Sequence, residues 1–218
     1  MIEHVYRRAA DAPGVDAVVV ATDDTRIADA VTAFGGVVRM TDPAHRTGTD
    51  RIAEIARGVD CDIVVNVQGD EPLIDPSTIA GVVSALRQDP SLQMASSCVA
   101  LTERADHTNP NVVKVVRSLT GDALYFSRAP IPHLRGHGPG RAPIFKHLGL
   151  YGYRRAFLLA FAALPQTPLE VSESLEQLRA LEHGHRIHLV ETPFDSIGVD
   201  TPDDLERVRQ HISATARA

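Results

Sequence analysis

Two short apolar runs constrain the fold more than any other feature of the chain. Residues Ala17–Ala21 and Ile63–Val67 consist almost entirely of alanine, valine and isoleucine. Runs without polar alternation are typical of strands that are buried on both faces of a sheet. Polar residues follow each run at once, Thr22-Asp23-Asp24 after the first and Gln68-Gly69-Asp70-Glu71 after the second. We therefore predict strands whose carboxyl ends carry a ligand site.

Helical patterns separate the apolar runs. This alternation of strands and helices is typical of an α/β protein with an open, mostly parallel sheet. In the first half of the chain we predict helices over residues 2–12, 24–34, 50–57 and around 79–86, with a further strand over 37–40. Gly35-Gly36 favours the end of the second of these helices.

In the second half of the chain, the alternation of single strands and helices is interrupted. Val112–Arg117 and Ala123–Ser127 predict an antiparallel hairpin with its turn at Thr120-Gly121-Asp122. The remaining predicted elements are a strand over 147–153, helices over 154–164 and 170–183, a strand over 187–191 and a last helix opening at 201–204. We expect one domain over residues 1–218, with residues 112–153 as an inserted antiparallel region.

Composition narrows the function classes. The chain carries 28 acidic and 22 basic residues, a net charge of −6, which argues against a nucleic-acid binder. Its two cysteines, Cys61 and Cys98, lie far apart and favour a reducing compartment over a disulfide framework. No apolar run approaches the roughly 20 residues of a membrane span, and the charged first dozen residues do not fit a signal peptide. We expect a cytoplasmic protein that does not act on membranes.

Two aspartates are candidate magnesium ligands. Asp70 follows a predicted strand beside Gly69, where a carboxylate suits a hard cation, although a simple Gly-Asp turn has the same pattern. Asp200 precedes Thr201, and it either holds metal or merely faces the positive end of the last helix. Two carboxylates at strand ends of one sheet would bind the metal of a phosphoryl-transfer site.

Three further segments have both a functional and a structural interpretation. The loop Arg46–Arg51 suits a nucleotide, or it is an N-cap formed by Thr49 or Asp50. His147 and Tyr151 share one strand face and suit sugar hydroxyls, or they are satisfied aromatic residues of a half-buried strand. Glu173, Glu176 and Gln177 are predicted on one helix beside a leucine stripe, where a solvated face is the usual case.

Six segments, in order along the chain, resemble the 3-deoxy-manno-octulosonate (Kdo) cytidylyltransferase family. They are Val19–Asp24, Asn66–Pro72, Tyr125–Arg128, His147–Tyr153, Leu175–Arg179 and Gly198–Asp204. Members of this family couple CTP to Kdo, release pyrophosphate and require Mg²⁺. They supply lipopolysaccharide assembly in Gram-negative bacteria, and they are usually homodimers with a Rossmann-like fold of the nucleotide-diphospho-sugar transferase type.

The resemblance implies a role for each matching residue. Asp70 and Asp200 match the catalytic magnesium carboxylates. The Kdo-pocket positions match Gln68, Arg128, His147, Tyr151, Glu176 and Gln177. Thr47 and Gly48 match the loop that lies against the nucleotide, with Arg51 near it.

One departure from the family pattern concerns the start of the chain. The family begins with a strand and a basic phosphate-binding loop, whereas Ile2–Val5 matches the helix that follows that loop. We therefore expect weak CTP binding, and unpaired backbone along Ala17–Ala21 and Ile63–Val67. The alternatives are a cytidylyltransferase for another sugar acid, such as sialic acid, and a catalytically impaired binding protein.

Overall fold

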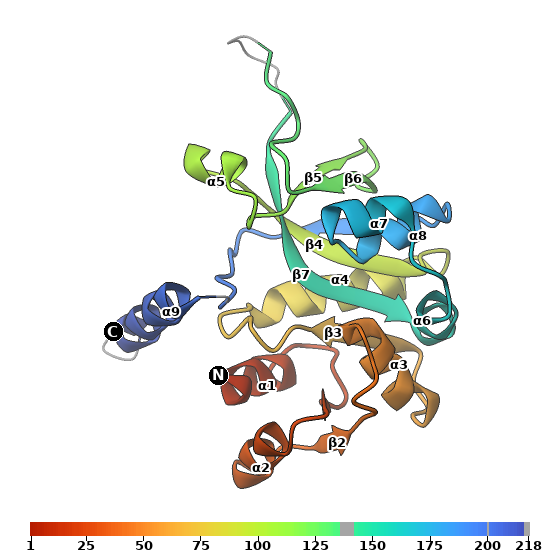
Figure 1. Cartoon of the computed structure of the whole chain (residues 1–218), viewed down its shortest axis with the longest axis vertical. Coiled ribbons are helices and arrows are strands. Elements are labelled where there is room, and N and C mark those ends of the chain that lie inside the picture. The colour runs from red at the N-terminus through yellow and green to blue at the C-terminus, as the bar shows by residue number, and fades with distance from the viewer. Residues whose placement is uncertain (136–141, 200, 216–218) are drawn as a thin grey trace.

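The computed structural model describes residues 1–135, 142–199 and 201–215 (Figure 1). Its strands are β1 (Val20–Thr22), β2 (Val38–Met40), β3 (Ile63–Val67), β4 (Met94–Ala100), β5 (Lys114–Arg117), β6 (Ala123–Ser127), β7 (Phe145–Arg154) and β8 (His188–Glu191). Its helices are α1 (Ile2–Ala10), α2 (Thr25–Ala33), α3 (Gly48–Arg57), α4 (Pro76–Gln88), α5 (Arg104–Thr108), α6 (Arg155–Ala162), α7 (Pro168–Glu173), α8 (Gln177–Glu182) and α9 (Pro202–Thr215). The predicted α/β class is confirmed.

The long strand β7 organises the larger sheet. It runs antiparallel to β3, β4 and β5, while β4 pairs in parallel with β8, and β5 and β6 form the predicted hairpin. The strand order is β6-β5-β7-β4-β8, with β3 also on β7. β1 and β2 form a separate parallel pair, so the protein combines parallel units with an antiparallel centre.

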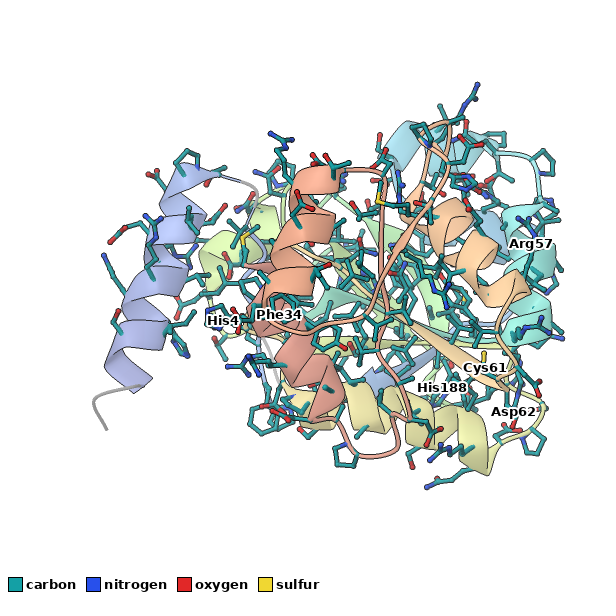
Figure 2. The ribbon with its side chains drawn as sticks, turned by 90° about the horizontal axis from the view of Figure 1, so that it is seen from below. His4, Phe34, Arg57, Cys61, Asp62 and His188 are labelled. Atoms are coloured by element: carbon teal, nitrogen blue, oxygen red, sulfur yellow. The ribbon has the colours of Figure 1, made fainter. Side chains whose placement is uncertain are left out.

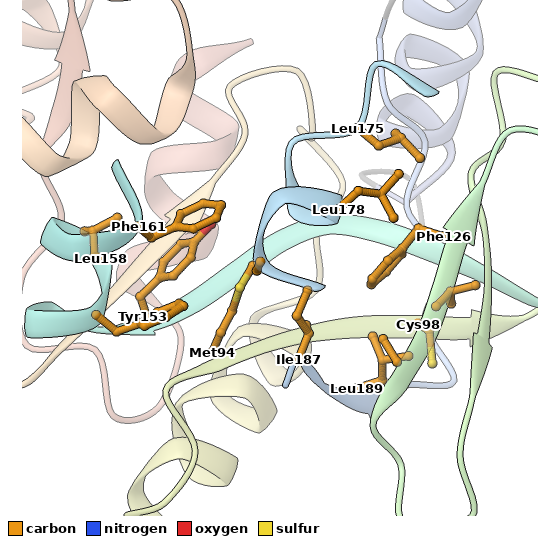
Figure 3. Close-up of a cluster of buried hydrophobic side chains, with 14 of the residues drawn as sticks. Met94, Cys98, Phe126, Tyr153, Leu158, Phe161, Leu175, Leu178, Ile187 and Leu189 are labelled. Atoms are coloured by element: carbon orange, nitrogen blue, oxygen red, sulfur yellow. The ribbon is translucent and has the colours of Figure 1, made fainter. Parts of the chain in front are cut away.

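The larger sheet separates two apolar clusters, because successive side chains of a strand point to opposite faces. Along β4, Met94 belongs to one cluster and Ala95 to the other. The first cluster packs helices α3, α6 and α8 on the sheet, and Figure 3 shows Phe161, Tyr153 and Leu178 within it. The second packs α1 and α4 on the opposite face.

The predicted strand over Ala17–Ala21 is mostly wrong, because β1 begins only at Val20. Backbone becomes a strand when a neighbour satisfies its hydrogen bonds, and β2 offers partners only to Val20–Thr22. The start of α3 also differs from prediction. Thr47, rather than Thr49 or Asp50, is the N-cap, and its Oγ1 accepts from Asp50 N at 3.1 Å.

The predicted helix over residues 170–183 is broken into α7 and α8. Ser174 ends α7 in the left-handed region with φ 52°, which no helix continues through. A buried ion pair spans the break, since Arg179 Nε donates to Glu170 Oε2 at 2.8 Å. Glu173 and Glu176 therefore do not lie on one continuous helix.

Strand β4 and helix α5 have no counterpart in the predictions from sequence. Among the helices of the described residues, none has the length and apolar character needed to cross a membrane.

Candidate active site

The end of β3 carries the first part of the site. Buried Asn66 lies near the end of the strand, and Gln68 follows it. Glycines face the Gln68 side chain from two elements: a Cβ on Gly48 would lie 3.8 Å from Gln68 Oε1, and one on Gly149 would lie 3.5 Å from Gln68 Cγ. The structure thus brings the predicted residues Gln68 and Gly48 together.

β7 contributes His147 and Tyr151, as the strand pattern predicts. Their ring centroids are 5.3 Å apart. The register of β4 and β7 slips between them: Ser96 lies opposite Tyr151, while Ser97 lies opposite Leu148. Such irregularities re-aim side chains and are frequent next to active sites.

His147 is a neutral side chain in this environment. It is 7% exposed, and burial lowers its pKa to about 3. Its Nε2 lies 2.8 Å from the hydroxyl of Ser96. His147 is therefore suited to hydrogen bonding a ligand rather than to holding a charge.

Glu176 and Gln177 lie at the start of α8, beside the first turn of α3. Thr49 Oγ1 donates to Glu176 Oε2 at 2.8 Å. Burial raises the pKa of Glu176 above its ordinary value, while hydrogen bonds from Thr49 and Thr47 oppose the rise. Two buried atoms here, Glu176 Oε1 and Gln177 Nε2, make no hydrogen bond within the described ranges, although Glu176 Oε1 lies 3.5 Å from Arg179 Nη2 in an ion pair. Because a buried polar atom is costly to leave without a hydrogen bond, Gln177 Nε2 in particular indicates a ligand position.

Arg128 is anchored at the α7–α8 junction. Its guanidinium donates to the carbonyl oxygens of Glu173 at 2.8 Å and Pro110 at 3.1 Å, and its backbone N–H donates to Glu173 Oε2 at 2.9 Å. Although burial raises the pKa of Glu173, interaction of its carboxylate with the charge of Arg128 helps to keep that pKa below its ordinary value. Arg128 is thus held as an oriented cation at the α7–α8 junction.

Arg51 has two partners within the chain. Its Nη1 donates to Thr41 Oγ1 at 2.5 Å, and its Nη2 lies 3.1 Å from Asp23 Oδ2. The side chain therefore ties α3 to the β1–β2 pair, and its charge is shared with Asp23.

Asp70 lies against the segment that leads to residue 200. Val199 N donates to the Asp70 carbonyl oxygen at 2.9 Å. Asp200 itself lies outside the described residues, so the predicted pair of carboxylates is not described as a pair. In the part of the chain that the structure describes, no group of three or more histidine, cysteine or acidic side chains is arranged to hold a metal.

Prediction from sequence missed one acidic member of the site. Glu71 accepts a hydrogen bond from Ser196 Oγ, and a Cβ on Gly198 would lie 3.5 Å from its Oε1. Burial raises the pKa of Glu71 above its usual range. Its position directly after Asp70 in the strand-end motif was the available signal.

The cytidylyltransferase family model matches residues 1–187, which is most of the chain, so the fold and site described above belong to a cytidylyltransferase. Within this class the chain belongs to the 3-deoxy-manno-octulosonate cytidylyltransferase family, as close relatives show. The enzyme of that name from Geobacter metallireducens is 53% identical over 222 residues, covering 98% of this chain and 87% of the relative. The one from Syntrophotalea carbinolica is 53% identical over 219 residues, with 97% and 88% covered.

Solved structures agree with this family. A CMP:2-keto-3-deoxy-manno-octonic acid synthetase complexed with CTP matches with a TM-score of 0.92 and 44% identity, covering 98% of this chain and 88% of the other. A 4-diphosphocytidyl-2C-methyl-D-erythritol synthase from Anaerococcus prevotii matches with a TM-score of 0.63 at 12% identity, covering 97% and 85%. The second similarity shows the fold alone.

Proposed function

We propose that this chain activates Kdo with CTP, giving CMP-Kdo and pyrophosphate for lipopolysaccharide assembly. The observation that carries this proposal is the pair of buried polar atoms, Glu176 Oε1 and Gln177 Nε2, that make no hydrogen bond within the described residues. One accepts and the other donates hydrogen bonds, which suits the hydroxyls of a sugar. The 3-deoxy-manno-octulosonate cytidylyltransferases at about half identity support the choice of sugar acid.

The reaction is an in-line displacement at phosphorus. The anomeric hydroxyl of Kdo attacks the α-phosphorus of CTP and gives up its proton to water, a new phosphorus–oxygen bond forms, and the bond to the departing pyrophosphate breaks. Gln68, His147, Tyr151, Glu176 and Gln177 orient the sugar, which replaces a chance encounter by a positioned reaction. Arg128, an oriented cation, takes the sugar carboxylate.

Asp70 and Asp200 are the residues that would hold Mg²⁺. The donor set fits, because the carboxylate of Asp70 is a hard oxygen ligand, and Val199, the neighbour of Asp200, is hydrogen bonded to Asp70. Bound Mg²⁺ supplies charge neutralisation for the triphosphate and the transition state.

Thr47 and Gly48 form the nucleotide side of the site. They open α3, whose first backbone N–H groups form a favourable position for an anion. Arg51 reaches the nucleotide only if it leaves Asp23 and Thr41, so it is a secondary contact in this proposal.

The setting of the enzyme is also part of the proposal. We place it in the cytoplasm as a homodimer, with the antiparallel region over residues 112–153 contributing to sugar binding and to the dimer. The hairpin β5–β6 and the β7 residues His147 and Tyr151 belong to that region.

The test combines the chain with CTP, Mg²⁺ and one sugar acid at a time. We expect pyrophosphate release with Kdo and at least tenfold less with sialic acid. Release with sialic acid alone would assign the chain to a different sugar-acid cytidylyltransferase. Calorimetric binding of Kdo without any pyrophosphate release would identify a non-catalytic binding protein instead.

A further inference from the structure

Lys114 is a cation buried within the larger sheet. It is the first residue of β5, and its side chain is fully buried. Its ammonium donates to three backbone carbonyl oxygens, those of Asn109 at 2.8 Å, Val112 at 2.5 Å and Arg128 at 2.7 Å. An ammonium has three N–H groups, so each of them has an acceptor. Because lysine is almost never fully buried, the position calls for a role beyond filling space.

The environment of Lys114 is unusual for a buried charge. Its three hydrogen bonds within the described chain go to neutral carbonyl oxygens and not to a carboxylate. Burial lowers the pKa of Lys114 below its ordinary value, the charge of Arg128 lowers it further, and the charge of Glu173 opposes both. Lys114 and Arg128 therefore lie close enough for their charges to repel. An anion bound by Arg128 would relieve that repulsion.

Lys114 and Arg128 hold the same turn. The turn runs from Asn109 to Val112 and is closed by a hydrogen bond from Val112 N to Asn109 O at 3.2 Å. Lys114 donates to the carbonyl oxygen at each end of the turn, and the Arg128 guanidinium donates to that of Pro110 inside it at 3.1 Å. Lys114 thus fixes the backbone of Arg128 and also one of the carbonyls that orient the Arg128 guanidinium.

We propose that Lys114 is a positioning residue for recognition of the sugar carboxylate, because it holds Arg128 in the orientation that binds this group. The inference rests on the proposed function, in which Arg128 takes the carboxylate of Kdo. Lys114 is fully buried and its three donors are occupied, so it does not itself contact the sugar. Its effect is therefore on affinity for the acid group and not on affinity for CTP or for the sugar hydroxyls.

The test compares the binding of Kdo with that of its methyl ester, which keeps the hydroxyls and lacks the negative charge. Lys114→Met keeps the length of the side chain and removes its N–H donors. In calorimetry it should weaken binding of Kdo about tenfold, with binding of the ester and of CTP changed by less than about twofold. Arg128→Met should show the same selectivity. In the double variant, Lys114→Met should add less than about twofold to the loss caused by Arg128→Met, because an absent guanidinium cannot be misplaced.

Arg155 offers a matched control at the other end of β3. Its guanidinium donates to the carbonyl oxygens of Ala56 at 2.7 Å and Arg57 at 3.1 Å, the last two residues of α3. Figure 2 labels Arg57 and also Asp62, which precedes β3, whereas Gln68 follows that strand. Arg155→Met therefore also takes a cation away from backbone carbonyls. It should lower Tm and leave the preference for Kdo over the ester unchanged.

A milder variant disturbs the same turn without touching a buried charge. The side-chain oxygen of Asn109 accepts from Asn111 N at 3.0 Å, a bond that shapes the turn and that Asn109→Ala removes. Asn109→Ala should weaken binding of Kdo about threefold and leave the ester unchanged. This measurement decides the matter if Lys114→Met does not fold.

The outcomes separate this inference from the proposed function. Equal losses for Kdo and the ester, or no loss for either, in Lys114→Met or Asn109→Ala would overturn the positioning role while the selectivity of Arg128→Met upheld the role of Arg128. If Arg128→Met itself showed no preference between the two ligands, the assignment of Arg128 to the sugar carboxylate would fail, and the inference with it.

Discussion

Ser96 determines which nitrogen of His147 carries the proton. The Ser96 hydroxyl donates to the Leu150 carbonyl oxygen at 2.7 Å, and His147 Nε2 lies 2.8 Å from the same hydroxyl. A hydroxyl has one hydrogen to give, so it must accept from His147 Nε2–H. Nδ1 of the neutral ring is then an acceptor, available to a ligand hydroxyl.

Replacing Ser96 should weaken sugar binding through this tautomer. Ser96→Ala leaves the buried Nε2–H without a partner, at a cost to stability of about 1 to 3 kcal/mol. It should weaken Kdo binding about tenfold in calorimetry, with CTP binding unchanged. Ser97→Ala is the matched control, because the buried Ser97 hydroxyl has no hydrogen-bond partner in the described chain. Equal losses in the two variants would contradict the role given to Ser96.

His147 should make the protein less stable as the pH falls below its ordinary pKa. Burial lowers the pKa of His147 from 6.5 to about 3, so between these values the unfolded chain binds more protons than the folded one. The free energy of unfolding then falls with falling pH by up to about 1.4 kcal/mol per pH unit. Denaturant titrations of the wild type and His147→Asn between pH 7 and pH 4 measure the difference.

The same titration contains an opposite contribution. The pKa values of Glu71 and Glu176 are raised above 4.5, so the contribution of these two groups to the free energy of unfolding falls as the pH rises above 4.5. These groups are unchanged in His147→Asn, so the difference between the two proteins isolates the histidine. Parallel curves for the two proteins would show that His147 does not titrate on unfolding.

Asp70→Asn should remove most turnover without unfolding the protein. An amide at the end of β3 cannot supply a full negative charge to Mg²⁺, so pyrophosphate release should fall about 100-fold or more. Asp75→Asn is the control, because Asp75 caps α4 and asparagine caps a helix equally well. Near-normal turnover of Asp70→Asn at saturating Mg²⁺ would exclude the metal role.

Glu176→Ala should act on the sugar rather than the nucleotide. The substitution removes the partner of Thr49, an ion-pair partner of Arg179, and one of the two buried atoms at the sugar position that make no hydrogen bond in the described chain. We expect the apparent KM for Kdo to rise about tenfold and that for CTP by less than twofold. Glu206→Ala on α9 serves as an exposed control. Equal rises in the apparent KM for Kdo and for CTP would show that Glu176 has a structural role and not a specific role in sugar binding.

The buried pair Glu170 and Arg179 should be costly to break from one side. Its side chains are 5% and 3% exposed, and Arg179 also lies over the Phe161 ring at 5.2 Å. Arg179→Met leaves the buried carboxylate of Glu170 without its ion-pair partner and should lower the free energy of unfolding by about 3 to 5 kcal/mol. Adding Glu170→Gln should recover part of that loss. A double variant less stable than Arg179→Met would contradict this account.

The local sequence pattern correctly predicted strands that have a hydrogen-bonding partner strand among the described residues. Ile63–Val67 forms a strand over the predicted residues, and the β5–β6 hairpin follows its turn signal. Residues 17–19 are as apolar as the predicted strands and yet form no strand, because β2 offers partners only to Val20–Thr22. Propensity does not supply a hydrogen-bond partner.

The remaining errors have different physical causes. Strand β4, with the sequence MASSCVA, is buried at six of its seven positions, but its serines hide that burial from a hydrophobic pattern. Ser174 adopts a left-handed conformation that serine seldom takes, so nothing local predicts the break between α7 and α8. Among the site residues, Glu176 and Gln177 are recognised by family resemblance, whereas Ser96 emerges only from the pairing of β4 with β7.

The central place of β7 also sets an order of events during synthesis. β3 and β4 both depend on β7 for their backbone partners, and β7 is made long after them. A ribosome that has completed β4 therefore carries two strands that are later paired by β7, without the strand that joins them. Such a nascent chain exposes aggregation-prone edges until Phe145–Arg154 emerges, so it is a natural client for chaperones that hold unfinished chains.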